Sequence, residues 1–177
     1  KIGLSDIMGI GRYNMLDDAE SSVFFSVIGG AMLPTGTTNA KDNAGEFLNS
    51  HMQLGTGAVV PLIGISAQYG SDDFSLSSGV LAAFPGKGVR DYQFGKNINY
   101  DLTSHYNLFK LGDFSSLFVS LGVMGEWHGQ EKNNGVEVLN TGGNTTYLSP
   151  GLQYLFDKHI SFEASYQYPF IHSLNGK

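Results

Sequence analysis

Hydrophobic and polar residues alternate along the middle of this chain with a period of two. From Tyr92 to Leu108 the apolar residues fall on one side, and the other side carries Gln93, Asn97, Asn99, Asp101, Thr103, His105 and Asn107. Because successive side chains of a β-strand point to opposite faces, the pattern predicts one long strand with an apolar and a polar face. Roughly seventeen residues extend about 56 Å at about 3.3 Å per residue, enough to cross a bilayer at a tilt and protrude.

The same period recurs in seven further segments, so eight strands are predicted. Their approximate ranges are 5–16, 22–33, 57–69, 74–84, 91–109, 116–128, 144–156 and 160–170. Pro61, Pro150 and Pro169 fall inside three of them. Since a proline has no N–H to donate to a sheet, we expect a bulge or a strand end at each.

The connections between these strands alternate in length. Short connections are expected at 17–21, 70–73, 110–115 and 157–159, long ones at 34–56 and 129–143, and one of intermediate length at 85–90. Outer-membrane barrels have short periplasmic turns and longer extracellular loops. The order therefore predicts an all-β fold, a transmembrane antiparallel up-and-down β-barrel in which residues 1–177 supply eight strands of a single domain. This order places both chain ends at the extracellular rim, so we expect truncation at both ends and an intact barrel of ten strands or more.

The composition favours a surface that is not covered by water alone. Charged residues make up 15% of the chain, against about 25% in a typical soluble domain. No apolar run is long enough for a transmembrane helix, whereas a barrel strand needs only about ten alternating residues. The net charge of -6 argues against a nucleic-acid partner, because such binding depends on neutralising phosphates with Lys and Arg. The absence of cysteine permits an oxidising compartment.

A soluble sandwich or lipocalin-like binder would use the same strands with the faces reversed, so that Tyr100 and Leu102 point into the core. Its water-facing sides would then carry mainly Asn, Ser, Gly and Gln, where a soluble surface carries many Lys and Glu. We therefore expect lipid on the apolar side, which includes Ile98, Leu121 and Leu152.

The polar faces supply the residues expected to line the barrel interior, namely Arg12, Gln93, Asn97, Asn99, Asp101, His105, Glu126, His128, Gln153, Glu163 and Gln167. Pairing the fifth and sixth strands predicts an acidic and amide-rich cluster of Asn97, Asn99, Asp101, Met124, Glu126 and His128. Such a lining can hold water and pass small solutes, with its carboxylates disfavouring anions. The alternative is that these side chains hydrogen-bond across a narrow barrel and plug it.

The two faces carry residues that bear on two kinds of chemistry, a metal site and a Ser–His pair. Glu126 and His128 point the same way with His105 on the neighbouring strand, but zinc needs three close ligands and the spacing fixes no third. A lipid-modifying enzyme needs a Ser and His pair toward the membrane, and the outward faces carry Ser78 and Ser104 without a histidine. We therefore expect no enzyme activity, no metal and no cofactor.

Short motifs occur over most of the chain: Leu33-Pro34-Thr35-Gly36, Tyr92-Gln93-Phe94-Gly95, Gly125-Glu126-Trp127-His128-Gly129, Asn140-Thr141-Gly142-Gly143, Tyr147-Leu148-Ser149-Pro150-Gly151-Leu152-Gln153-Tyr154 and Gln167-Tyr168-Pro169 with Leu174-Asn175-Gly176. With these motifs the chain resembles the outer-membrane proteins grouped as the putative meta-pathway of phenol degradation family, often called transporters. The resemblance implies a small barrel that admits aromatic or other hydrophobic compounds in the outer membrane of a Gram-negative bacterium. Family members continue past the Leu-Asn-Gly segment into a final strand.

We therefore expect a porin-like channel for passive passage of small hydrophobic or aromatic molecules, surrounded by membrane lipid and lipopolysaccharide. The alternative is a structural or scaffold barrel that anchors or sheathes a partner component, which a filled lumen and ordered contacts from the long loops would favour. A protein partner would bind through loops 34–56 and 129–143. The first of these loops is either a gate that folds inward or a mobile solvated loop, and the mobile loop is the preferred interpretation.

Overall fold

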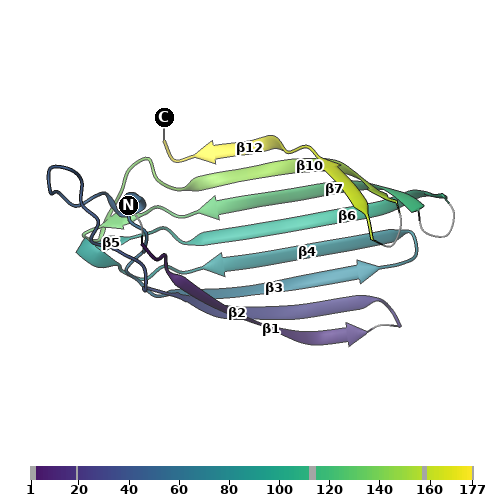
Figure 1. Cartoon of the computed structure of the whole chain (residues 1–177), viewed down its shortest axis with the longest axis horizontal. Helices are drawn as coiled ribbons and strands as arrows, with labels where there is room; N and C mark the ends of the chain where they lie inside the picture. The colour runs from purple at the N-terminus through teal and green to yellow at the C-terminus, as the bar shows by residue number, and fades with distance from the viewer. Residues whose placement is uncertain (1–2, 19, 112–114, 157–158, 177) are drawn as a thin grey trace.

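The computed structural model describes residues 3–18, 20–111, 115–156 and 159–176. One antiparallel sheet contains the strands β1 (Ile7–Asp18), β2 (Val23–Leu33), β3 (Val60–Gly70), β4 (Phe74–Ala83), β6 (Asn97–Leu111), β7 (Ser115–His128), β10 (Gly143–Leu155), β11 (Ser161–Ser165) and β12 (Tyr168–Leu174). Figure 1 shows most of these strands side by side in chain order. The two helices described, η1 (Ser50–Met52) and η2 (Val89–Asp91), are too short to span a membrane.

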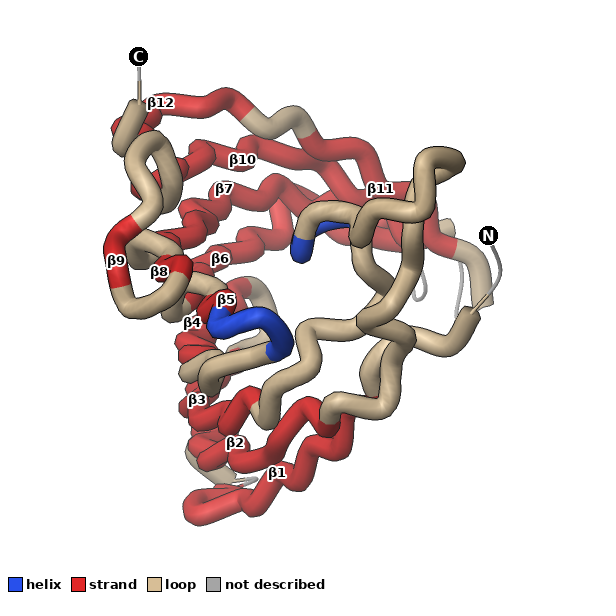
Figure 2. Tube along the Cα trace, turned by 90° about the vertical axis from the view of Figure 1, so that its left-hand side faces the viewer, coloured by secondary structure: helices blue, strands red, loops and turns tan. Residues whose placement is uncertain are grey.

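The strand order confirms the predicted antiparallel up-and-down order, and the described strands do not close into a barrel. The order is β1-β2-β3-β4-β6-β7-β10, and both β11 and β12 pair with β10. In the described ranges no pairing joins β1 to β11 or β12, so the sheet is open, and Figure 2 shows it as a curved wall. The long loops lie at one end of the strands and the short turns at the other, as predicted (Figure 1).

The predicted strand 91–109 is wrong at its start, because the chain leaves the main sheet before Asn97. The residues Tyr92–Gln93 form β5, which pairs with β8 (Lys132–Asn133) and, through it, with β9 (Val136–Glu137) in a separate small sheet. Gly95 packs so closely on the backbone of Gly129 that a Cβ atom there would overlap the carbonyl oxygen. The amide of Gly129 in turn donates to the carbonyl of Lys96 at 2.8 Å. Because of this close backbone approach, residues 92–96 leave the main sheet although their hydrophobic and polar residues still alternate.

The prolines explain two strand boundaries. A backbone N–H and C=O of one residue face the same neighbour in an antiparallel ladder. The carbonyl of Pro150 accepts from the amide of Tyr166 at 3.0 Å, so its missing N–H faces the gap between β11 and β12, which divides the predicted strand 160–170. The carbonyl of Pro61 accepts from Phe84 just past the end of β4, which is the expected strand end. The register shifts beside Pro169, which is the expected bulge.

The two faces of the sheet differ in the way the alternation predicts. Leu102, Leu121 and Leu152 are each about half exposed, at 48%, 52% and 52%, whereas Ser26 on the other face is 1% exposed. Within the described residues the buried apolar core comprises only Ala58, Val60 and Leu62. The alternative fold, a sandwich or lipocalin-like barrel with Leu102 inside its core, is therefore wrong.

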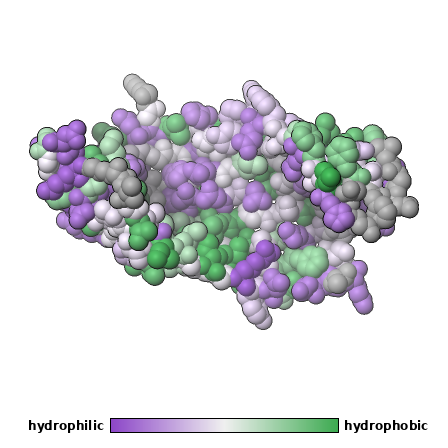
Figure 3. All heavy atoms as spheres, in the orientation of Figure 1, coloured by the Kyte–Doolittle hydropathy of each residue, from purple (hydrophilic) through white to green (hydrophobic). Residues whose placement is uncertain are grey.

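The face that carries Leu102 is called the outward face here, and it has no charged side chain over most of the sheet. The pairing register assigns to it alternate residues of β2, β3, β4, β7 and β10, and of β6 from Ile98 to Tyr106, and none is Asp, Glu, Lys, Arg or His. The opposite, concave face is mixed: Figure 3, viewed from this side, shows hydrophilic and hydrophobic residues interleaved.

Candidate functional site

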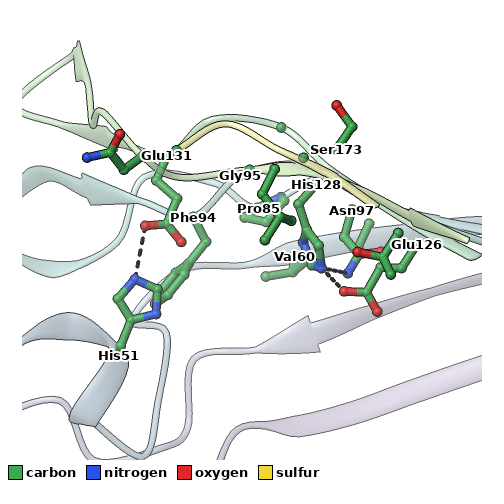
Figure 4. Close-up of a pocket in the computed structure, with 18 of the residues that line it drawn as sticks. His51, Val60, Pro85, Phe94, Gly95, Asn97, Glu126, His128, Glu131 and Ser173 are labelled. Atoms are coloured by element: carbon green, nitrogen blue, oxygen red, sulfur yellow. Dashed lines mark hydrogen bonds and ion pairs between the residues drawn. The ribbon is translucent and has the colours of Figure 1, made fainter. Parts of the chain in front are cut away.

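A cavity of about 1240 Å³ opens on the concave face at the long-loop end of the sheet. Its floor comes from the sheet and includes Val60, Asn97, Glu126 and His128. Its rim comes from loops and includes His51 and Glu131 (Figure 4). The sheet therefore positions one half of the site, and the long connections position the other.

The floor contains a chain of polar side chains on β6 and β7. The register places Asn97 opposite His128 and Asn99 opposite Glu126, the neighbours predicted from the sequence. The amide of Asn99 donates to the Oδ1 atom of Asn97 at 2.8 Å, and the Asn97 amide lies 3.5 Å from His128 Nε2. His128 and Glu126 point toward one another and form an ion pair when the imidazole is protonated (Figure 4).

His105 does not join this cluster. It lies opposite Ser75 and Ser120, six positions along β6 from Asn99, which is about 20 Å at about 3.3 Å per residue. Asp101 lies opposite Met124 as predicted. Across the described parts of the chain, no three His, Cys, Asp or Glu side chains are grouped as a metal site requires.

The other residues predicted to line the interior lie away from the cavity. Arg12 is paired with Ile28 near the β1 edge, and Gln153 lies between Phe118 and Glu163 on the concave face. The amide of Gln167 lies 3.3 Å from the sulfur of Met124. Gln93 is in β5, outside the main sheet, and its amide donates to the carbonyl of Pro85 at 2.8 Å.

Three side chains from three different connections meet at the rim. His51 Nε2 lies 2.9 Å from Glu131 Oε2 and 3.1 Å from the hydroxyl of Tyr92, and that hydroxyl donates to the same carboxylate oxygen. The ring of Phe94 packs edge-on against His51, with ring centroids 5.2 Å apart. Figure 4 shows His51 and Glu131 pointing toward each other across the cavity mouth. Burial, then the hydrogen bond to Glu131 and its negative charge, raise the pKa of Tyr92 to about 12.

Local hydrogen bonds hold these side chains in place. Asn49 caps η1 by accepting from the amide of His51 at 3.2 Å. The amide of Glu131 donates to Thr141 Oγ1 at 3.1 Å, and Thr141 donates to the carbonyl of Val138 at 2.7 Å. The loop that carries His51 and the loop that carries Glu131 are therefore each held by hydrogen bonds of their own, in addition to the contact between them.

Sequence reasoning missed this rim cluster. The alternation assigned Tyr92 and Phe94 to the apolar side of a long strand, but the break at Gly95 places them beside His51 and Glu131. The partners are up to 80 positions apart in the chain, so no spacing rule joins them. The one available signal was a glycine inside the alternating segment, because an isolated glycine in a strand pattern marks a bulge or a close backbone approach.

The charge of the cavity is one-sided. The residues that line it include Glu126 and Glu131 but no Lys or Arg among those described, and its three histidines are His51, His128 and His172. With neutral imidazoles the site carries negative charge, so it favours cations and neutral molecules over anions.

Two comparisons with known proteins bear on this arrangement. The model of a family described as "Putative MetA-pathway of phenol degradation" matches residues 3–171. The match spans both the sheet and the loops that line the cavity. A search of curated proteins found no match.

Proposed function

The chain belongs to this phenol-degradation family, and we propose that its sheet is the wall of an outer-membrane β-barrel through which small hydrophobic or aromatic molecules pass unchanged. The observation that carries the proposal is the outward face. It is apolar, uncharged and exposed, as Ile63 at 61% and Leu121 at 52% illustrate. A contiguous exposed apolar surface of this kind is typical of contact with a membrane or with another protein.

Several polar groups on the outward face find partners within the sheet. Ser104 donates to the carbonyl of Leu121 at 3.2 Å. The hydroxyl of Tyr100 crosses over Gly125 to pair with Thr146 Oγ1 at 2.6 Å, and Thr146 is 3% exposed. The hydrocarbon core of a bilayer offers no hydrogen-bonding groups, so polar side chains that face it must pair with one another within the protein. Polar side chains that face water have no such requirement.

Aromatic residues mark two levels on the outward face. Trp127 lies opposite Ile98 at the long-loop end, and Tyr106 lies on the same strand as Ile98, eight positions nearer the short turns. Eight residues extend about 26 Å at about 3.3 Å per residue, or roughly 20 Å of depth at a tilt of about 40°. This separation is close to the apolar band of about 25 Å that aromatic girdles flank in outer-membrane barrels.

The concave face supplies a route for solutes. The volume of its cavity, about 1240 Å³, exceeds the roughly 300–1,000 Å³ of ordinary small-molecule sites, and it is large compared with the volume of a single aromatic ring. Asn97, Glu126 and His128 give it a polar floor that water can wet. A passive, non-enzymatic role requires nothing further from these residues.

A scaffold role is the second candidate, because one observation favours it. The loop after β2 is tied to neighbouring loops by hydrogen bonds, as His51 and Glu131 illustrate, and ordered loop contacts are expected of a barrel that presents its surface to a partner. The open cavity beneath them favours passage instead.

Planar-bilayer conductance of the full-length protein separates the two roles. We expect stepwise conductance in potassium chloride, with a reversal potential that shows cations passing more readily than anions. Replacing Glu126 with Gln removes one carboxylate from the cavity and is expected to reduce that preference, whereas Glu137→Gln, on the exposed strand β9, leaves it unchanged. A native protein that neither conducts nor releases benzyltrimethylammonium from liposomes would remove the channel and leave the scaffold.

A further inference from the structure

The connection between β2 and β3, residues 34–59, lies over the concave face and is called the lid below. Two of its residues, His51 and Thr56, line the cavity together with the sheet. Figure 2 shows this connection on the open side of the curved sheet, facing the strands. The lid therefore forms the wall of the cavity that lies opposite the β-strands.

The base of the lid is firmly attached. Asp6 accepts from the amide of Gly36 at 2.8 Å and from both the amide and the hydroxyl of Thr56 at 2.7 Å. Burial alone would raise the pKa of Asp6, but these donors outweigh it and hold the pKa below its usual value. The two arms of the lid meet here, since a Cβ atom on Gly36 would lie 2.7 Å from the Cα atom of Gly55.

The body of the lid is held by its own hydrogen bonds. The amide group of Gln53 donates to the carbonyls of Ala40 and Leu48 at 3.0 and 2.9 Å and accepts from the amide of Ala40 at 2.9 Å. Gln53 thus joins the two arms of the lid into one unit.

The far end of the lid is held by weaker contacts. His51 reaches Glu131 and Tyr92, and these three residues are called the latch. The His51 side chain is 54% exposed and that of Glu131 is 13% exposed, so water reaches the contact from the His51 side and weakens it. A second contact joins Arg90 to the ring of Phe47, with the guanidinium carbon 4.8 Å from the ring centroid.

We propose that residues 34–59 are a lid that controls access to the cavity, and that the His51, Tyr92 and Glu131 latch holds it closed. The proposal rests on the proposed function, because a lid regulates passage only if there is passage. A lid can open without unfolding if its base is firmly bonded, its body is held by its own hydrogen bonds, and its far end is held by weaker polar contacts. Residues 34–59 have these three features. Release of His51 removes the bridge between the lid and the opposite loop at the cavity mouth.

The test uses the full chain in vesicles and planar bilayers with two latch variants and two matched controls. His51→Ala and Glu131→Gln break the latch. Met52→Ala changes the next residue of the lid, which is 67% exposed, and Glu137→Gln makes the same charge change elsewhere in the loop after β7. One readout is the mean conductance in potassium chloride, and the other is the rate of trypsin cleavage after Lys41, an exposed residue of the lid.

We expect both latch variants to show about two- to fivefold higher mean conductance and similarly faster cleavage after Lys41, the factor that loss of a weak surface contact gives. The controls are expected to match the native protein in both readouts. If the latch variants conduct as the native protein does, the lid is overturned while the channel stands. If neither the native protein nor any variant conducts, the proposed function falls, and the lid's role in passage falls with it.

Discussion

The substitution Leu102→Arg tests whether lipid covers the outward face. Leu102 is 48% exposed and lies four positions from Ile98, which faces Trp127, and four positions from Tyr106. It is therefore about 13 Å along the strand from each aromatic level, at the midplane of the proposed apolar band. An arginine at the midplane of a membrane barrel costs about 2–4 kcal/mol of folding free energy. That cost lowers the ratio of folded to unfolded protein by roughly 30- to 1000-fold.

The matched control is Leu33→Arg, because Leu33 is also 48% exposed but ends β2 at the rim. A charge near the interface costs only about 0–1 kcal/mol. The free energy of unfolding is measured by urea titration in phospholipid vesicles, with the emission of Trp127, the single tryptophan, as the signal. Equal costs for the two variants, both within about 0.5 kcal/mol of zero as on an ordinary soluble surface, would refute the membrane assignment.

Three further predictions concern the lid, the latch and the sheet. Asp6→Asn replaces one oxygen of the carboxylate that serves three donors, and it is expected to speed trypsin cleavage after Lys41. Because the folded pKa of Asp6 is lowered, the stabilisation from its carboxylate is present above the ordinary value of 3.8 and is lost as the pH falls through the lowered pKa. The phenolate absorbance of Tyr92, taken as the difference between the native protein and Tyr92→Phe, is expected to give a titration midpoint near pH 12, and Glu131→Gln is expected to lower this midpoint. The stabilisation of the folded state that comes from the raised pKa of Tyr92 is present below pH 10 and is lost as the pH rises through about 12. Gly125→Ala is expected to lower the free energy of unfolding, measured by urea titration, by about 1–3 kcal/mol, because its Cβ atom overlaps the ring of Tyr100. Gly29→Ala is the control, since a Cβ atom there meets nothing within 4 Å. Equal losses for the two variants would contradict the overlap.

Local alternation was sufficient to predict most of the sheet. A period of two depends only on neighbouring residues, so the ranges of β2, β4 and β7 and the face of Leu121 follow from it. The pairing of Asn97 with His128 followed as well, because a short turn fixes the register of the hairpin that contains it.

Other features depend on contacts that no local pattern encodes. Residues 91–96 keep the alternation, yet the approach of Gly95 to Gly129 diverts them into the loops. Pro150 interrupts the strand beside it rather than its own, which the sequence of 160–170 does not show. The contact between His51 and Glu131 joins residues 80 positions apart, so the sequence pattern did not predict that two residues of the connection after β2, His51 and Thr56, line the cavity.

The placement of the outward face in lipid is tested most directly by quenching the fluorescence of Trp127, which is 40% exposed on that face. The full-length protein is refolded into vesicles that contain phospholipids brominated at graded depths along the acyl chain, and iodide is added outside as an aqueous quencher. We predict strong quenching by bromines near the headgroup end of the chains, weaker quenching by deeper ones, and little quenching by iodide. Efficient quenching by iodide with none by the brominated lipids would contradict the account.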